Sequence, residues 1–239
     1  MSKRFRDRSD AGRQLAVLLT PLRGQDVLVL ALPRGGVPVG YEIARALHAS
    51  LDVLNVRKLG VPWHEELAMG AIAAEGIRVL NNDVIVACSI SATVIEEVTS
   101  LQRVELDRRE RLYRGGRPAP EVRGRTVVLV DDGIATGATV RAAITVARAQ
   151  QPKHLVLAAP VVQRSVADML QREVDEFACL QRPHHLYAIG VWYERFPQLR
   201  DDEVHAIMAR AAAESAPAGA GPSPAHSIGD VQTPDAPIK

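Results

Sequence analysis

The chain has 239 residues, of which 47% are hydrophobic, and a formal net charge of +1. It can bury the core of one main domain, and its near-neutral charge gives no overall reason to expect nucleic acid as a partner. The cysteines, Cys88 and Cys179, lack metal-ligand spacing, which predicts two reduced, buried thiols in a cytoplasmic protein. The sequence predicts neither a signal peptide nor a membrane span.

The N-terminal part alternates between apolar runs and helical spacing. Ser9 or Asp10 is expected to cap a first helix that runs to about Leu19. A buried strand over 27–32, a PRGG turn and a helix over 37–49 follow, and then a second strand over 51–59. The next segment, GVPWHEELAMG, is polar and contains a proline, which favours a mobile loop before a small-residue strand at 68–74.

A long polar helix is predicted from Ser91 to about Tyr113. Its arginines either lie on a solvent-exposed face, in ion pairs such as Glu105 with Arg109, or form a basic flap that covers an anionic ligand. These arginines are Arg103, Arg108, Arg109 and Arg111.

Two more units of strand followed by helix come next, at 125–150 and 154–173. This alternation predicts an α/β fold with a mainly parallel twisted sheet flanked by helices. The segment 214–239 is rich in Ala, Pro, Gly and Ser, so we expect a main domain over 1–213 and a disordered tail.

The run VVLVDDGIATGATV, residues 127–140, carries the chemistry. Its loop joins the carboxyl end of a strand to the start of a helix, where backbone N–H groups and the helix dipole favour a phosphate. Two carboxylates beside a phosphate repel it unless a sugar separates them, with its phosphate in the loop and its vicinal hydroxyls on Asp131 and Asp132. The alternative is an acidic N-cap supplied by Asp132 alone.

This run closely resembles the signature with which type I phosphoribosyltransferases bind phosphoribosyl pyrophosphate (PRPP). The resemblance implies the type I phosphoribosyltransferase fold, with a small variable hood from the N-terminal segment and residues of about 180–200. It implies that Asp131 and Asp132 are the catalytic pair and contact the ribose. The 5-phosphate would lie on Gly133, Ile134, Ala135, Thr136, Gly137, Ala138 and Thr139.

Two further elements of the family fit this chain. PRGGVPVG resembles the turn that offers backbone amides to the pyrophosphate, usually with a cis peptide, here between Pro33 and Arg34. Arg57 and Lys58 resemble a basic pair of the orotate-type enzymes, although a solvated pair at a strand end is the alternative. The loop lysines of those enzymes are missing here, which argues against orotate as the acceptor. The predicted pyrophosphate residues are thus Pro33, Arg34, Gly35, Gly36, Arg57 and Lys58.

The resemblance implies a transfer of the 5-phosphoribosyl group to a nitrogenous base or related acceptor, with release of pyrophosphate. Mg²⁺ would accompany PRPP, and no direct protein ligand to the metal is assigned. Trp192 and Tyr193 are candidates for stacking on the acceptor, or else they are buried beside the final helix. His64 either assists proton transfer or is an exposed loop histidine without a role.

The sequence also allows other functions. The chain is also similar to a group of bacterial predicted phosphoribosyltransferases whose acceptors are generally unassigned, through RKLGVPWHEELAMGAI and WYERFPQLRDDEV. The main alternative is a noncatalytic sensor of PRPP or nucleotides, which the absence of a helix-turn-helix disfavours. RNA binding through the helical arginines is disfavoured by the near-neutral charge. A homodimer is expected from the resemblance alone.

Overall fold

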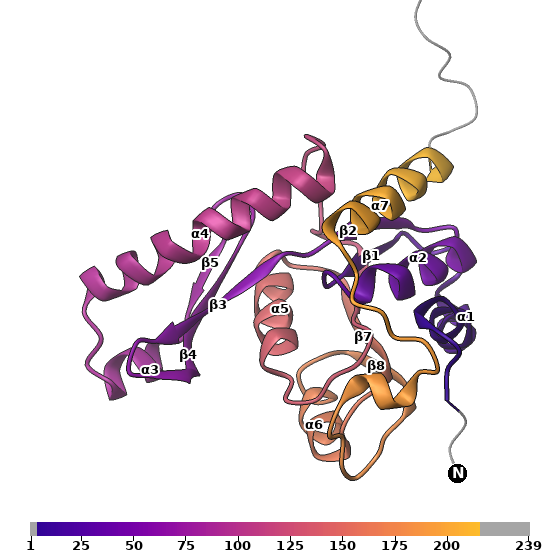
Figure 1. Cartoon of the computed structure of the whole chain (residues 1–239). Helices are drawn as coiled ribbons and strands as arrows, with labels where there is room; N and C mark the ends of the chain where they lie inside the picture. Colours follow the sequence, from indigo (N-terminus) through magenta and orange to yellow (C-terminus); the bar gives the residue numbers. More distant parts are fainter. Residues whose placement is uncertain (1–3, 216–239) are drawn as a thin grey trace, which may run out of the picture.

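The computed structural model describes residues 4–215, so nearly all of the segment predicted to be a disordered tail lies outside the described residues. Its main body is a five-stranded parallel sheet (Figure 1). The strand order is β2 (Ser50–Val53), β1 (Val27–Ala31), β6 (Thr126–Val130), β7 (His154–Val161) and β8 (Glu176–Gln181). β1 and β6 are buried along their whole length, as expected for parallel strands covered on both faces.

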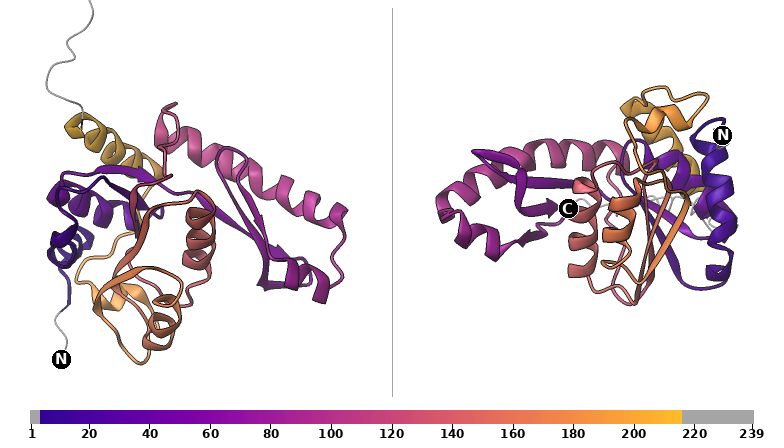
Figure 2. Two further views of the ribbon diagram at one scale, coloured as in Figure 1. Left: turned by 180° about the vertical axis from the view of Figure 1, so that it is seen from behind. Right: turned by 90° about the horizontal axis from the view of Figure 1, so that it is seen from below.

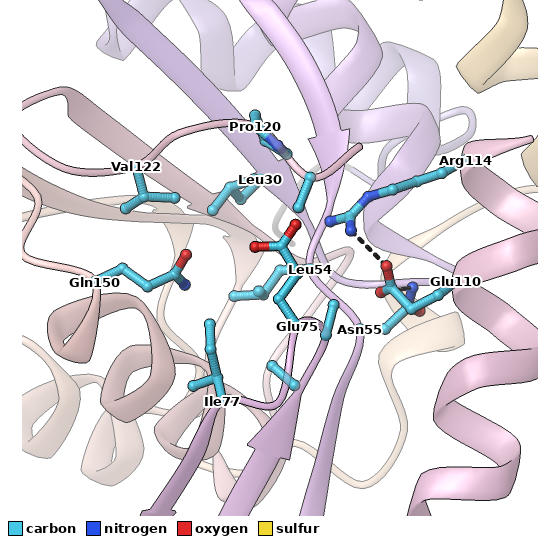
Figure 3. A pocket seen from close by; sticks show the side chains of 13 residues that line it. Leu30, Leu54, Asn55, Glu75, Ile77, Glu110, Arg114, Pro120, Val122 and Gln150 are labelled. Carbon is cyan, nitrogen blue, oxygen red and sulfur yellow. Dashed lines mark hydrogen bonds and ion pairs between the residues drawn. The ribbon is translucent and has the colours of Figure 1, made fainter. Parts of the chain in front are cut away.

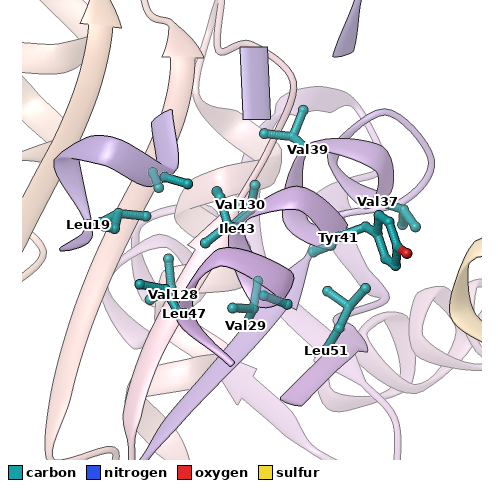
Figure 4. Packing of buried hydrophobic residues seen from close by; sticks show 14 of the residues in the cluster. Leu19, Val29, Val37, Val39, Tyr41, Ile43, Leu47, Leu51, Val128 and Val130 are labelled. Atoms are coloured by element: carbon teal, nitrogen blue, oxygen red, sulfur yellow. The ribbon is translucent and has the colours of Figure 1, made fainter. Parts of the chain in front are cut away.

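Helices cover both faces of this sheet, which confirms the predicted α/β class. One face carries α1 (Arg8–Leu18), α2 (Gly36–Leu47) and α7 (Asp201–Ser215), and the other carries α5 (Ala138–Ala149) and α6 (Arg164–Leu170). Successive strand residues point to opposite faces, so Val29 and Val128 pack against Ile43 of α2 in the first core (Figure 4). Leu28 and Leu129 point to the second core instead.

A smaller unit extends to one side of the parallel sheet (Figures 1 and 2). It consists of an antiparallel sheet and two helices: β3 (Val56–Val61), β4 (His64–Ala73), β5 (Arg78–Leu80), α3 (Asn82–Ala87) and α4 (Ala92–Arg114). Its separate core joins Leu59, Met69 and Ile72 of the sheet to Ile95 and Leu106 of α4. Two 3-10 helices, η1 (Thr20–Leu22) and η2 (Ile189–Trp192), complete the elements of the described residues.

Several local expectations were wrong. The apolar run 51–59 is not one strand: it crosses from the parallel sheet to the antiparallel one at Leu54 and Asn55. The predicted loop over 60–67 closes a β-hairpin instead, because β3 and β4 pair with each other. Asp7 caps α1, since its side chain accepts from the Asp10 amide. Cys88 and Cys179 are free thiols, as expected, but both are half-buried rather than fully buried.

A buried ionic cluster joins α4 to β2, and Figure 3 shows two of its members, Arg114 and Glu110 of α4. The Arg114 guanidinium donates to Glu110 at 2.5 Å, to Asp52 at 3.1 Å and to the Val53 carbonyl at 3.0 Å. Its side chain is 8% exposed, and those of Asp52 and Glu110 are 10% and 14% exposed. Burial raises the pKa of Glu110, whereas Asn55 and Arg114 lower it. One cation therefore holds two carboxylates where the smaller unit meets the main sheet.

Across residues 4–215, no helix combines the length and the apolar character that a membrane crossing requires.

Candidate active site

Two loops meet at the carboxyl edge of the parallel sheet because β1 and β6 are neighbours. The amide of Leu32, just past β1, donates to the carbonyl of Val130 at the end of β6, at 2.8 Å. At Gly36 a Cβ atom would lie 2.5 Å from that carbonyl oxygen, so the backbones touch. The two loops predicted for pyrophosphate and 5-phosphate are therefore side by side.

The second of these loops, residues 133–139, has the character of an anion cradle. In the described part of the chain, the amides of residues 135–139 have no hydrogen-bond acceptor, and Thr136 and Thr139 are both exposed. Gly137 caps α5 with φ +78°, a conformation that favours glycine. Ile134 is different: its side chain is buried and its amide donates to Val161 at 2.9 Å. Ile134 therefore anchors the loop and is not free to bind a phosphate.

The first loop, residues 33–36, offers fewer amides. The Gly36 amide donates to the Leu32 carbonyl. The amides of Arg34 and Gly35 have no acceptor among the described residues. The peptide bond between Pro33 and Arg34 is cis, as the resemblance implies. The Arg34 guanidinium is held by the Leu199 carbonyl at 2.6 Å and by Asp201 at 3.4 Å. Arg34 therefore ties this loop to the start of α7.

The acidic pair follows β6, and its two carboxyl groups have different surroundings. Asp131 is half-buried and accepts from the Asp132 amide at 2.8 Å. Asp132 is buried and accepts from the Arg8 guanidinium at 2.7 Å. Burial raises the pKa of both groups; the neighbouring charge of Asp132 raises that of Asp131 further, and Arg8 opposes both shifts. Asp132 is thus ion-paired inside the protein, whereas Asp131 is the more exposed residue of the two.

Gly35 leaves room for this arrangement. A Cβ atom at residue 35 would lie 2.0 Å from Oδ2 of Asp132. We expect Gly35→Ala to displace that carboxylate and to lower the free energy of unfolding by about 3 kcal/mol, measured by urea denaturation. The φ angle of Gly35 is −62°, which alanine adopts readily, so the loss would come from the contact alone.

Gly24→Ala is the comparison for this substitution. No atom lies within 4 Å of a Cβ atom there, and its φ of +83° leaves only a backbone cost of about 1 kcal/mol. A Gly35→Ala protein as stable as the wild type would contradict the packing of Asp132 on the first loop.

The predicted basic residues do not all reach one cavity. Pro33, Arg57 and Thr139 line the same small cavity, which joins the three predicted ligand-binding elements. Arg109 of α4 lines it too, although Glu105 also pairs with that arginine at 2.7 Å. Lys58 is the next residue of β3, so its side chain lies on the opposite face of the strand, and it lines a separate cavity beside α5. Arg57, rather than Lys58, is therefore the member of the pair that shares a cavity with Thr139.

The predicted hood segments do lie together. The Phe5 amide donates to the Trp192 carbonyl at 2.9 Å, and Ile189 packs on Gly133, where a Cβ atom would lie 2.5 Å from its Cγ2. Trp192 is half-buried in the same aromatic cluster. Tyr193 is buried between Phe5 and Phe196, with ring centroids 5.4 and 4.9 Å away.

This packing does not support a stacking contact between Tyr193 and the acceptor. The Tyr193 hydroxyl donates to the Asp132 carbonyl at 2.6 Å, which fixes the main chain of the acidic pair. Arg8 was missed by the sequence reasoning altogether. It is one of several arginines in a polar N-terminal segment, and the sequence contains no signal that connects it with Asp132.

Among the side chains that the structure describes, no group of three or more from His, Cys, Asp or Glu could hold a metal ion alone. The exposed hydroxyls of Thr136 and Thr139 are nevertheless oxygen donors, and Mg²⁺ prefers oxygen ligands, including the phosphate oxygens of a bound ligand. The site therefore fits a magnesium ion that arrives with a phosphorylated ligand.

Comparison with known proteins agrees with this geometry. The family model of the phosphoribosyl transferase domain matches residues 11–184. Two Mycobacterium tuberculosis proteins, each named "putative phosphoribosyl transferase", are 49% identical over 218 residues, which are 91% of this chain and 49% of theirs. The chain thus spans about half the length of these curated relatives. The crystal structure of TT1426 from Thermus thermophilus matches with a TM-score of 0.81 at 40% identity, over 87% of this chain and 98% of that one. The chain therefore belongs to the phosphoribosyl transferase domain family.

Proposed function

We propose that the protein binds PRPP with Mg²⁺ and transfers the 5-phosphoribosyl group to a nitrogenous base or related acceptor, releasing pyrophosphate. One observation carries this proposal. Two loops with unpartnered amides lie side by side, and the half-buried Asp131 lies where they meet, since a Cβ atom at Gly36 would be 3.1 Å from its Cα atom. This order of groups corresponds to the order of pyrophosphate, ribose and 5-phosphate in the ligand.

Each loop has a separate task in this proposal. The amides of residues 135–139 and the hydroxyls of Thr136 and Thr139 hold the 5-phosphate at the start of α5. The amides of Arg34 and Gly35 face the pyrophosphate, and Arg57 adds positive charge to the shared cavity. Asp131 accepts hydrogen bonds from the ribose hydroxyls and stabilises the positive charge that develops on the ribose ring. Catalysis is then mainly positioning and electrostatics.

Magnesium bound to the pyrophosphate would supply charge neutralisation of the leaving group. The chain's own residues would orient PRPP so that the acceptor nitrogen meets the ribose C1 from the face opposite the pyrophosphate. The bond from C1 to the pyrophosphate oxygen breaks, and that oxygen keeps the electron pair. The new bond forms between C1 and the acceptor.

Other predictions concern the assembly, the location and the partners of the protein. The homodimer expected from the resemblance and the cytoplasmic location expected from the sequence remain predictions. RNA binding by α4 loses support, since Arg108 and Arg109 pair with Glu105 at 2.8 and 2.7 Å. Trp192 remains a candidate for contact with the acceptor.

The experiment is pyrophosphate release from PRPP and Mg²⁺ by the purified protein, screened against pools of purines, pyrimidines and nicotinate-like bases. We expect release that depends on one pool and is lost in the Asp131→Asn/Asp132→Asn double variant. PRPP binding without release in any pool would favour a noncatalytic sensor. The absence of PRPP binding would contradict the proposed function.

A further inference from the structure

Arg8 reaches the acidic pair from the other end of the chain. It is the first residue of α1 and lies 124 positions before Asp132 in sequence, yet its Nε donates to Asp132 Oδ2 at 2.7 Å. Both side chains are only 10% exposed. The guanidinium also donates to the Pro197 carbonyl at 2.7 Å and stacks 3.7 Å above the ring of Phe196. Arg8 is therefore fixed on several sides and is itself shielded from a ligand in the loops.

Asp132 is confined by the same arrangement. Its carboxylate lies against the backbone of Gly35, and a Cβ atom there would be 2.0 Å from Oδ2 and 2.8 Å from Oδ1. Its carbonyl accepts from the Tyr193 hydroxyl at 2.6 Å. Side chain and main chain of Asp132 are thus held by α1, by the first loop and by the segment after η2. No such clamp exists for Asp131 among the described residues. The one hydrogen bond of its side chain there is accepted from the Asp132 amide.

We propose that Arg8 is a positioning residue: it clamps Asp132 against Gly35, joins the two ligand loops, and leaves Asp131 as the carboxylate that meets the ribose. This inference rests on the proposed function for the ribose, but the clamp itself does not. It assigns different tasks to two carboxylates that the sequence presents as an equivalent pair.

The electrostatics support the same division. The charged and titratable groups that face Asp132 are Arg8 from α1, Asp131 from its own loop and the Tyr193 hydroxyl. Burial raises the pKa of Tyr193, so its hydroxyl stays neutral. Arg8 is the charged group that opposes the effect of burial by lowering the pKa of both aspartates. Without Arg8, both carboxyl groups would keep their protons to higher pH, and the ribose would more readily face a neutral acid.

The first test is a carbon-13 NMR titration of the Asp132 carboxyl group in the ligand-free protein. Arg8→Met should raise its midpoint by about one to three pH units, the effect of losing a close opposite charge. Arg8→Lys should keep the midpoint near that of the wild type, because the charge remains. Arg13→Met is the matched control on the same helix, since Arg13 is half-exposed and pairs with Glu42 instead. An unchanged midpoint in Arg8→Met would overturn the clamp.

The second test is calorimetric binding of PRPP with Mg²⁺ across the same pH range. Arg8→Met should weaken binding about tenfold or more at neutral pH and move the loss of binding at acid pH to higher pH. Equal affinity and an equal pH profile in the wild type and Arg8→Met would overturn the positioning role. If the wild type itself binds no PRPP, the proposed function fails, while the Asp132 titration still decides whether Arg8 holds that carboxylate.

Discussion

Asp132→Asn is expected to lower the free energy of unfolding by about 3 kcal/mol, because it leaves the Arg8 guanidinium buried without its counter-charge, and this loss exceeds the relief of an Asp132 carboxylate whose own pKa is raised by burial. Asp131→Asn should instead raise the free energy of unfolding at neutral pH, since it removes a carboxylate whose pKa is raised by burial and by Asp132. An asparagine at 131 can still accept from the Asp132 amide. PRPP binding should nevertheless be lost in Asp131→Asn. Urea denaturation of both variants, alongside PRPP calorimetry, separates stability from ligand binding.

The stability difference between the wild type and Asp131→Asn should depend on pH, which checks the sign of the expected effect. A carboxyl group whose pKa is raised in the folded state destabilises that state once it ionises, so the wild type loses stability as pH rises from the ordinary value through the raised one. The stability difference between wild type and Asp131→Asn should therefore be present at neutral pH. It should vanish below the ordinary Asp pKa of about 3.9, where both proteins carry a neutral group. A difference that persists unchanged at acid pH would contradict this assignment.

Arg114→Met should be the most damaging substitution outside the candidate site. It removes the one cation that pairs with the buried carboxylates of Asp52 and Glu110 in the described part of the chain, and we expect a loss of about 3 to 5 kcal/mol at neutral pH. Arg114 opposes the effect of burial on Glu110, so without the cation the pKa of Glu110 rises further, and the defect should shrink as pH falls and Glu110 becomes protonated. Urea denaturation at several pH values measures it.

Arg108→Met is the matched control on the same helix. Its side chain is 49% exposed and pairs with Glu105 and Asp201 on the surface, so its loss should change the urea midpoint little. Equal losses in the two variants would mean that the cluster around Arg114 has no special role in joining the smaller unit to the main sheet.

The parts of the site that the sequence predicts are local in sequence. Two glycines, two threonines and two aspartates within residues 131–139 are enough to indicate an anion loop after a strand. The turn at 33–36 follows a strand of the same character, and neighbouring parallel strands bring such turns to one edge. The α/β class follows from the same alternation.

The rest depends on contacts between distant segments. The clamp by Arg8 needs α1 to pack beside a loop 124 residues later, and a buried arginine has no separate mark in a polar helix. Tyr193 shows the same limit, because an aromatic cluster fits both a stacking site and a small core. The run 51–59 has strand character throughout, and only the pairing partners reveal that it serves two sheets.

Calorimetric titration of PRPP in the presence of Mg²⁺ tests the central claim most directly, with wild type and Asp131→Asn compared side by side. The wild type should show saturable binding, and Asp131→Asn should bind at least about a hundredfold more weakly, as expected when a group that orients the ligand is lost. No binding by the wild type, or equal affinity in the two proteins, would contradict the assignment of the two loops and of Asp131 to PRPP.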